Sequence, residues 1–165
     1  MAAKAAIIMG SKSDYAVVRP AADTLEKFGV ETEVRVISAH RTPDAAHAFA
    51  SGARENGFEV IICAAGKAAH LGGVVAAYTT LPVIGLPVKT DMMGGLDSLL
   101  SIVQMPSGIP VATVGVNAGE NAALLALEIL GIKYPDIAEK LLAHKKSMAA
   151  KIAADDAALQ TERNA

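Results

Sequence analysis

A histidine and an arginine stand side by side in the segment Ser38-Ala39-His40-Arg41-Thr42-Pro43. An imidazole can give and take a proton near neutral pH, and a guanidinium can hold a phosphate through two parallel hydrogen bonds. Taken alone, the pair is more typical of a surface histidine beside an ion-paired arginine. A second polar segment, earlier in the chain, favours a site that binds a phosphorylated molecule and moves a proton.

That segment is Gly10-Ser11-Lys12-Ser13-Asp14, a turn of small residues that leads into a predicted helix. Backbone N–H groups at a helix start and two serine hydroxyls suit a phosphate. The spacing is neither that of a P-loop nor G-x-G-x-x-G, so we expect neither a nucleoside triphosphate nor a dinucleotide. Ser13 or Asp14 could instead only cap the helix, and the two roles are compatible.

A third segment places His70 among small residues, in Ala65-Gly66-Lys67-Ala68-Ala69-His70-Leu71-Gly72-Gly73. Alanine and glycine let the backbone approach a ligand closely. The alternative is a histidine that is hydrogen-bonded within its own loop. Both interpretations stay open from these residues.

Five short apolar runs and six amphipathic stretches must position these segments. The runs are nearly continuous rather than alternating, which is typical of strands covered on both faces of a parallel sheet. We predict strands at residues 4–9, 33–37, 59–64, 82–86 and 110–114, and helices at 14–28, 43–56, 68–78, 96–103, 117–130 and 135–160. The alternation predicts an α/β fold, a three-layer α/β/α arrangement around a doubly wound parallel sheet of five strands, with one additional helix at the C-terminus.

The polar segments follow the first three predicted strands, and Lys89-Thr90-Asp91 follows the fourth. In open parallel sheets, ligands bind beyond the carboxyl ends of the strands. We therefore expect one site at this edge, within a single domain of residues 1–165 whose core spans about 4–131. Two other histidines, His47 and His144, fall in predicted helices, where we expect them to be exposed or locally paired.

The last predicted helix is long for a monomer of this size. It carries apolar residues along its whole length: Ile137, Leu141, Leu142, Met148, Ile152 and Leu159. One domain of 165 residues has little room to cover all of them. We expect this helix to pack on a neighbouring subunit, and the alternative is a partly solvated helix on its own domain.

Composition excludes several classes of protein. The formal net charge is −2, so no basic excess is present for binding nucleic acid. Cys63 is the single cysteine, which excludes a disulfide framework and a cysteine-based zinc site, and we expect it to be buried. His40, His47 and His70 lack acidic partners at ligand spacing, so no metal is expected. No run reaches the roughly 20 apolar residues of a membrane span and no signal peptide is recognisable, so we expect a cytoplasmic protein.

Four motifs in the same order resemble the N5-carboxyaminoimidazole ribonucleotide mutase family of purine biosynthesis. The family patterns are G-S-x-S-D, S-A-H-R-T-P, A-G-x-A-A-H-L and D-S-L-x-S-I-V-Q-M-P-x-G-[IV]-P-V-A-T-V. This chain matches them at residues 10–14, 38–43, 65–71 and 97–114, and the resemblance extends over about residues 4–142. It implies a flavodoxin-like or Rossmann-like sheet, an octamer with active sites at subunit contacts, and no metal or organic cofactor.

The resemblance also implies a reaction: a carboxylate moves from the exocyclic nitrogen of an aminoimidazole ribonucleotide to carbon 4 of its ring. CO2 is released, trapped and added again. His40 would be the general acid and base, and Arg41 would hold the phosphate. The remaining substrate contacts implied are Ser11, Ser13, Asp14 and Ser38 around the ribose phosphate, and Ala65, Gly66, Lys67, His70 and Leu71 around the imidazole and CO2.

Two residues depart from the family pattern. Lys67 replaces a glycine and Gly72 replaces a proline. Lys67 either brings a cation near the carboxylate pocket or points to solvent. Arg41 favours the mutase over the related class that carboxylates the ribonucleotide directly with CO2, which usually has lysine there.

Two alternatives from other classes compete with an enzyme. A non-catalytic phosphoribosyl- or flavin-binding module would need aromatic side chains for a flavin, and Tyr15 is the only one near these loops. A phosphate-accepting receiver domain would need acidic residues where Gly10 and Gly66 stand, so this class is set aside.

Overall fold

The structure is a computed structural model and describes residues 2–164. At its centre is a sheet of five strands in the order β2-β1-β3-β4-β5, and every neighbouring pair is parallel. The strands are β1 (Lys4–Met9), β2 (Glu31–Val36), β3 (Val60–Ala65), β4 (Val83–Pro87) and β5 (Ala112–Thr113). This strand order confirms the predicted doubly wound sheet and is that of flavodoxin-like folds.

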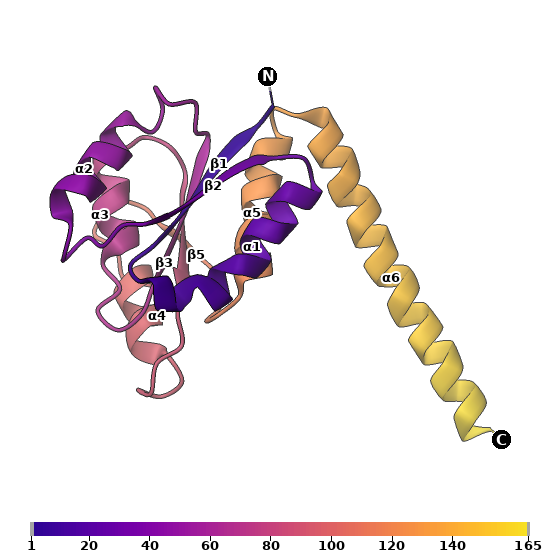
Figure 1. Cartoon of the computed structure of the whole chain (residues 1–165). Coiled ribbons are helices and arrows are strands. Elements are labelled where there is room, and N and C mark those ends of the chain that lie inside the picture. The colour runs from indigo at the N-terminus through magenta and orange to yellow at the C-terminus, as the bar shows by residue number, and fades with distance from the viewer. Residues whose placement is uncertain (1, 165) are drawn as a thin grey trace.

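Helices cover both faces of the sheet (Figure 1). They are α1 (Tyr15–Lys27), α2 (Pro43–Gly52), α3 (Leu71–Tyr78), α4 (Leu96–Val103), α5 (Gly119–Gly131) and α6 (Pro135–Arg163), with a short 3-10 turn, η1 (Lys12–Asp14), before α1. Helices α1 and α5 pack on one face, whereas α2, α3 and α4 pack on the other. Crossovers therefore pass to both sides, as the alternation of strands and helices predicts.

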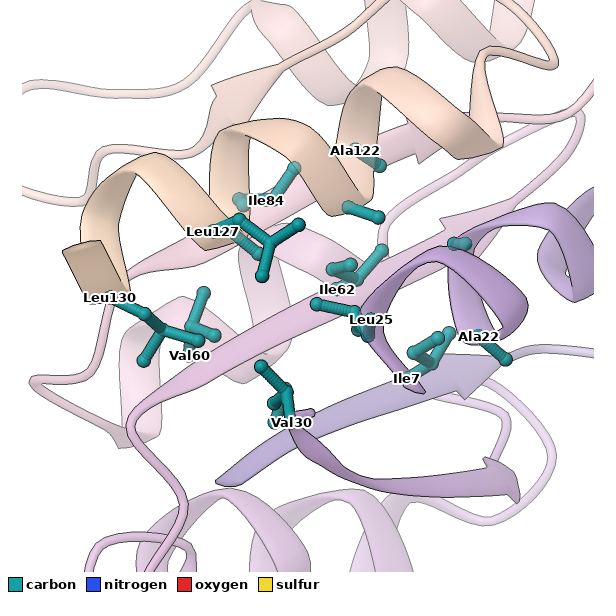
Figure 2. Close-up of a cluster of buried hydrophobic side chains, with 14 of the residues drawn as sticks. Ile7, Ala22, Leu25, Val30, Val60, Ile62, Ile84, Ala122, Leu127 and Leu130 are labelled. Carbon is teal, nitrogen blue, oxygen red and sulfur yellow. The ribbon is translucent and has the colours of Figure 1, made fainter. Parts of the chain in front are cut away.

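Successive side chains of β3 point to opposite faces and enter two separate cores. Val60 and Ile62 join the core beneath α1 and α5, which Figure 2 shows with Leu25 and Leu127. Ile61 and Cys63 join the core beneath α2 and α3. All residues of β3 are buried, which is why its sequence is continuously apolar. Burial also raises the pKa of the Cys63 thiol, so this residue is a core residue rather than a nucleophile.

Strand register aligns the carboxyl ends of the first four strands. Met9 pairs with Val36 on one side and with Ala64 on the other, and Ala65 pairs with Pro87. The loops that follow these strands therefore leave the sheet at one edge. This alignment brings together segments that are up to about eighty residues apart in the sequence.

Several predicted boundaries are wrong for local reasons. α3 begins at Leu71 rather than residue 68, because Lys67 has φ 56°, outside the right-handed helical region. α2 ends at Gly52 rather than residue 56, since a turn follows that closes at Gly57. β5 contains two residues rather than five, because only Ala112 and Thr113 pair with β4.

Helix α6 extends away from the rest of the molecule (Figure 1). Of its 29 residues only Ile137 and Leu141 are buried. Leu142, Met148, Ile152 and Leu159 are 46–67% exposed, so residues 2–164 leave them largely uncovered. Within residues 2–164, no helix is both long and apolar enough to cross a bilayer.

A close approach between α1 and α5 depends on Gly119, at the start of α5. A Cβ atom there would overlap the backbone carbonyl oxygen of Val17, which cannot move aside as a flexible side chain could. We expect Gly119→Ala to lower the free energy of unfolding by about 2 kcal/mol and the Tm by roughly 5 °C. Thermal unfolding followed by circular dichroism would measure it. Gly115→Ala is the matched control, because its new Cβ meets only the side chain of Ala118, at 3.7 Å; equal losses in both variants would contradict the expectation.

Candidate functional site

A pocket of about 490 Å³ lies at the carboxyl edge of the sheet, where the loops after β1, β2, β3 and β4 meet. All eleven residues singled out from the sequence line it: Ser11, Ser13, Asp14, Ser38, His40, Arg41, Ala65, Gly66, Lys67, His70 and Leu71. Six further residues complete the lining: Gly10, Ala39, Ala68, Val88, Lys89 and Thr90. The topology thus brings four separate segments into one cavity.

The first loop is organised around the hydroxyl of Ser11. Its oxygen accepts hydrogen bonds from the backbone N–H of Ser13 at 3.3 Å and from the Ser13 hydroxyl at 2.8 Å. Ser11 is therefore the residue that caps η1, whereas Asp14 precedes α1 without a capping hydrogen bond from its side chain. The alternative interpretation, that Ser13 or Asp14 only caps the helix, is therefore wrong. Their hydroxyl and carboxyl groups line the pocket instead.

Arg41 connects the first and second loops. Its Nη2 donates to the carbonyl oxygen of Gly10 at 2.5 Å, and its Nε donates to the Ser38 hydroxyl at 3.4 Å. Thr42 closes the same loop, because its hydroxyl accepts from the backbone N–H of Ser38 and donates to the Ser38 carbonyl. Thr42 precedes α2 as predicted, but its side chain bonds Ser38 rather than the helix. These bonds fix the guanidinium beside the serines.

Asp14 is the one carboxylate among the described residues that line the pocket. Burial raises the pKa of Asp14 above its ordinary value, although the Ser13 hydroxyl, the Ser11 backbone and Arg41 oppose this effect. Three cations, Arg41, Lys67 and Lys89, line the same cavity. The pocket is therefore suited to an anionic ligand.

His40 and His70 are in direct contact. Nε2 of His40 lies 2.8 Å from Nδ1 of His70, and the rings are nearly perpendicular, with centroids 4.9 Å apart. One of the two nitrogens must carry a hydrogen for this bond to form. The ring partner of His70 is thus a histidine 30 residues away rather than a group in its own loop. The contact orients His40 at the pocket wall.

The sequence places the fourth loop at the same edge as the site, but none of its residues was named among the site residues. Val88, Lys89 and Thr90 line the pocket, and three polar side chains from later elements hold them. Ser98 donates to the Val88 carbonyl at 2.8 Å, Asn117 accepts from the Lys89 N–H at 2.8 Å, and the Thr90 hydroxyl donates to Asp97 at 2.6 Å. The available signal was the position of Lys89 and Thr90 directly after the fourth strand.

The other two histidines lie outside this pocket. The ring of His47 packs edge-on against Tyr78, with ring centroids 4.5 Å apart. The ring of His144 packs edge-on against Phe28, with centroids 6.1 Å apart. His47 is exposed, as predicted, whereas His144 is partly buried and its Nε2 has no hydrogen-bond partner among the described residues. Among the residues the structure describes, no group of three or more His, Cys, Asp or Glu side chains could hold a metal ion.

Comparisons with known proteins agree on one family. The family model described as AIRC, AIR carboxylase, matches residues 4–151. The N5-carboxyaminoimidazole ribonucleotide mutase of Pyrococcus horikoshii is 61% identical over 88% of this chain and 82% of its own. The crystal structure of Treponema denticola PurE superposes with a TM-score of 0.86 at 32% identity, covering 93% of this chain and 96% of that one. The chloroplastic phosphoribosylaminoimidazole carboxylase of Vigna aconitifolia is 54% identical over 81% of this chain but only 24% of its own.

Proposed function

The chain belongs to the AIR carboxylase family, and we propose that it is an N5-carboxyaminoimidazole ribonucleotide mutase, an isomerase of purine biosynthesis. The observation that carries the proposal is the identity of 54–61% with proteins of that name over most of the chain. The pocket supports it, because a histidine that could exchange a proton, an arginine and three serines all line one cavity.

The substrate's phosphate would bind at the first two loops. The hydroxyls of Ser11 and Ser13 and the guanidinium of Arg41 would offer donors there. Asp14 and Ser38 lie beside them and would contact the ribose. Phosphate binding would then orient the ring toward His40, so that binding energy away from the reacting atoms is used for alignment.

His40 would transfer the single proton that the isomerisation exchanges. When the bond between the exocyclic nitrogen and the carboxylate breaks, CO2 leaves and protonated His40 donates a proton to the nitrogen. Carbon 4 of the electron-rich ring then attacks the carbon of CO2 and forms the new C–C bond. His40 takes the proton from carbon 4, which restores the ring and the initial state of the enzyme. No step uses a metal or an organic cofactor.

Released CO2 must be retained between the two steps. It is small and neutral, so it has to be confined by the shape of the cavity rather than by charge. Ala65 and Leu71 are buried at the pocket wall, and Gly66 lies beside them. This apolar wall, close to His70, would hold CO2 next to the ring.

A second candidate is direct carboxylation of aminoimidazole ribonucleotide with CO2, which the name of the Vigna relative favours. The deciding experiment supplies the chain either with the N-carboxylated ribonucleotide or with the uncarboxylated ribonucleotide and bicarbonate. We expect rapid conversion of the first and slow use of the second at low bicarbonate. The opposite ranking would identify a carboxylase, and no product from either would leave a non-catalytic phosphoribosyl-binding module.

We further propose that α6 packs on neighbouring subunits in an octamer. Ile137 and Leu141 are the buried residues of α6, and Met148, Ile152 and Leu159 continue their stripe at spacings of seven and four residues. The apolar side of α6 that its first turns bury against this domain therefore continues along the helix as an exposed apolar face. An apolar stripe of this length is typical of a helix that another subunit covers.

Ile152→Glu is expected to shift the protein from octamers to smaller species. Ile152 is 67% exposed in the single chain, so the substitution should leave the fold of one subunit intact. Light scattering coupled to size exclusion would measure the mass. Ala154→Glu adds the same charge on the other side of the helix and should keep the octamer; a monomeric wild-type protein would contradict the proposal.

A further inference from the structure

The main pocket is lined by three cationic side chains that come from three different loops. Arg41, Lys67 and Lys89 line it against the carboxylate of Asp14, although the whole chain has a formal net charge of −2. Three cations less one carboxylate leave two positive charges, about what one phosphate monoester neutralises, so the position of the cations and not their number is what points to a second anionic group.

The cations are distributed along the sheet edge. Arg41 follows β2, Lys67 follows β3 and Lys89 follows β4, and the strand order is β2-β1-β3-β4. Neighbouring strands are about 4.8 Å apart, so the loop after β1 and the loop after β4 are separated by roughly 10 Å. The serines and Arg41 therefore form one end of the pocket, and the two lysines form the other.

The two ends also differ in how their cations are engaged. Arg41 is bonded to Gly10 and Ser38. Within residues 2–164, no side chain forms a hydrogen bond or ion pair with the ammonium group of Lys67 or Lys89. The hydrogen bonds that these two residues form run through their backbone, at the Lys67 carbonyl and the Lys89 N–H. Both ammonium groups are thus available to a ligand.

The backbone at Lys67 is in a conformation that favours glycine. Its φ is 56°, in the left-handed region, and the adjacent loop is held by a hydrogen bond from the Ser101 hydroxyl to the Lys67 carbonyl and by one from His70 N–H to the Ala68 carbonyl. Glycine would adopt this conformation with less strain. A lysine in its place, at the wall of the pocket, indicates that the side chain has a use.

We propose that Lys67 binds the carboxylate of the substrate, with Lys89 as the second cation at the same end of the pocket. This inference rests on the proposed function, since it identifies the two anionic groups as the phosphate and the carboxylate that migrates. Lys67 would stabilise the ribonucleotide carrying its carboxylate on nitrogen or on carbon 4. Lys67 would contribute little to the binding of the uncarboxylated ribonucleotide, which occupies the pocket while CO2 is free.

The test compares two ligands that differ only in the carboxylate. Dissociation constants are measured by calorimetry for 4-carboxy-5-aminoimidazole ribonucleotide and for 5-aminoimidazole ribonucleotide. Lys67→Met is expected to weaken binding of the carboxylated ligand about 10-fold, as for loss of one charged hydrogen bond. Binding of the uncarboxylated ligand should change less than about twofold, and Lys67→Arg should preserve most of the difference.

Lys67→Gly separates binding from backbone strain. We expect it to unfold at the same or a higher temperature than the wild type, because the left-handed conformation suits glycine, and yet to lose the preference for the carboxylated ligand. Lys27→Met removes an exposed lysine at the end of α1 and should leave both dissociation constants unchanged.

The inference would be overturned if Lys67→Met bound both ligands equally more weakly than the wild type, or if it bound both as tightly as the wild type. Wild-type turnover is measured in parallel. If the wild type interconverts the two carboxylated isomers while the variant shows no selective loss, the inference fails and the proposed function stands. If the wild type does not interconvert them, the proposed function fails whatever the binding shows.

Discussion

Replacing His40 by asparagine is expected to lower kcat by about 10³-fold or more. Asparagine has a similar size and can still make a hydrogen bond, but it cannot accept a proton from carbon 4 or deliver one to the exocyclic nitrogen. His40 lies in the pocket with Nε2 directed at His70, so its loss removes the proton carrier and leaves the phosphate end intact. Steady-state turnover of the N-carboxylated ribonucleotide would measure it.

The variant should remain folded and should still bind the ribonucleotide product within a few-fold of the wild type. Ser11 is bonded to Ser13, and Arg41 is bonded to Ser38 and to the Gly10 carbonyl; none of these bonds involves the His40 side chain. His47→Asn is the matched control, because His47 lies on α2 and packs against Tyr78 outside the pocket. Near-normal turnover in His40→Asn would refute the role of His40 as the acid and base.

Sequence patterns predicted the sheet and the loops well because both follow from simple physical rules. A strand buried on both faces must be continuously apolar, as β3 is, and parallel strands must end at a common edge. The eleven site residues stand at or just beyond the ends of the first three strands, and the resemblance to the family selected them within those loops. Their catalytic and binding roles are the proposal that the variants test.

Contacts between distant segments could not be predicted in the same way. The loop of Val88 to Thr90 was expected at this edge, but the bonds from Ser98, Asn117 and Asp97 that hold it against the pocket follow from no local pattern. The bond between His40 and His70 likewise depends on how two loops converge. The length of β5 was overestimated because its apolar composition does not show how many residues pair with β4.

Arg41→Met is expected to weaken binding of the ribonucleotide about 10²-fold, equivalent to about 2.7 kcal/mol. The guanidinium would supply a bidentate, charge-assisted contact to the phosphate, and methionine keeps much of the side-chain volume without the charge. The effect should appear mainly in KM, because Arg41 lies at the phosphate end of the pocket rather than beside the reacting atoms. Inhibition by the nucleoside, which lacks the phosphate, should be nearly unchanged.

This comparison of nucleotide with nucleoside separates phosphate binding from loop structure. Arg41 also bonds Gly10 and Ser38, so its removal could loosen both loops and weaken every ligand alike. Arg41→Lys keeps the charge but lacks the planar guanidinium, which can bond Gly10 and a phosphate at the same time. We therefore expect an intermediate loss of ribonucleotide affinity. If the nucleoside weakens as much as the nucleotide, Arg41 acts on the pocket's shape; if only the nucleotide weakens, the phosphate site is where the first two loops meet.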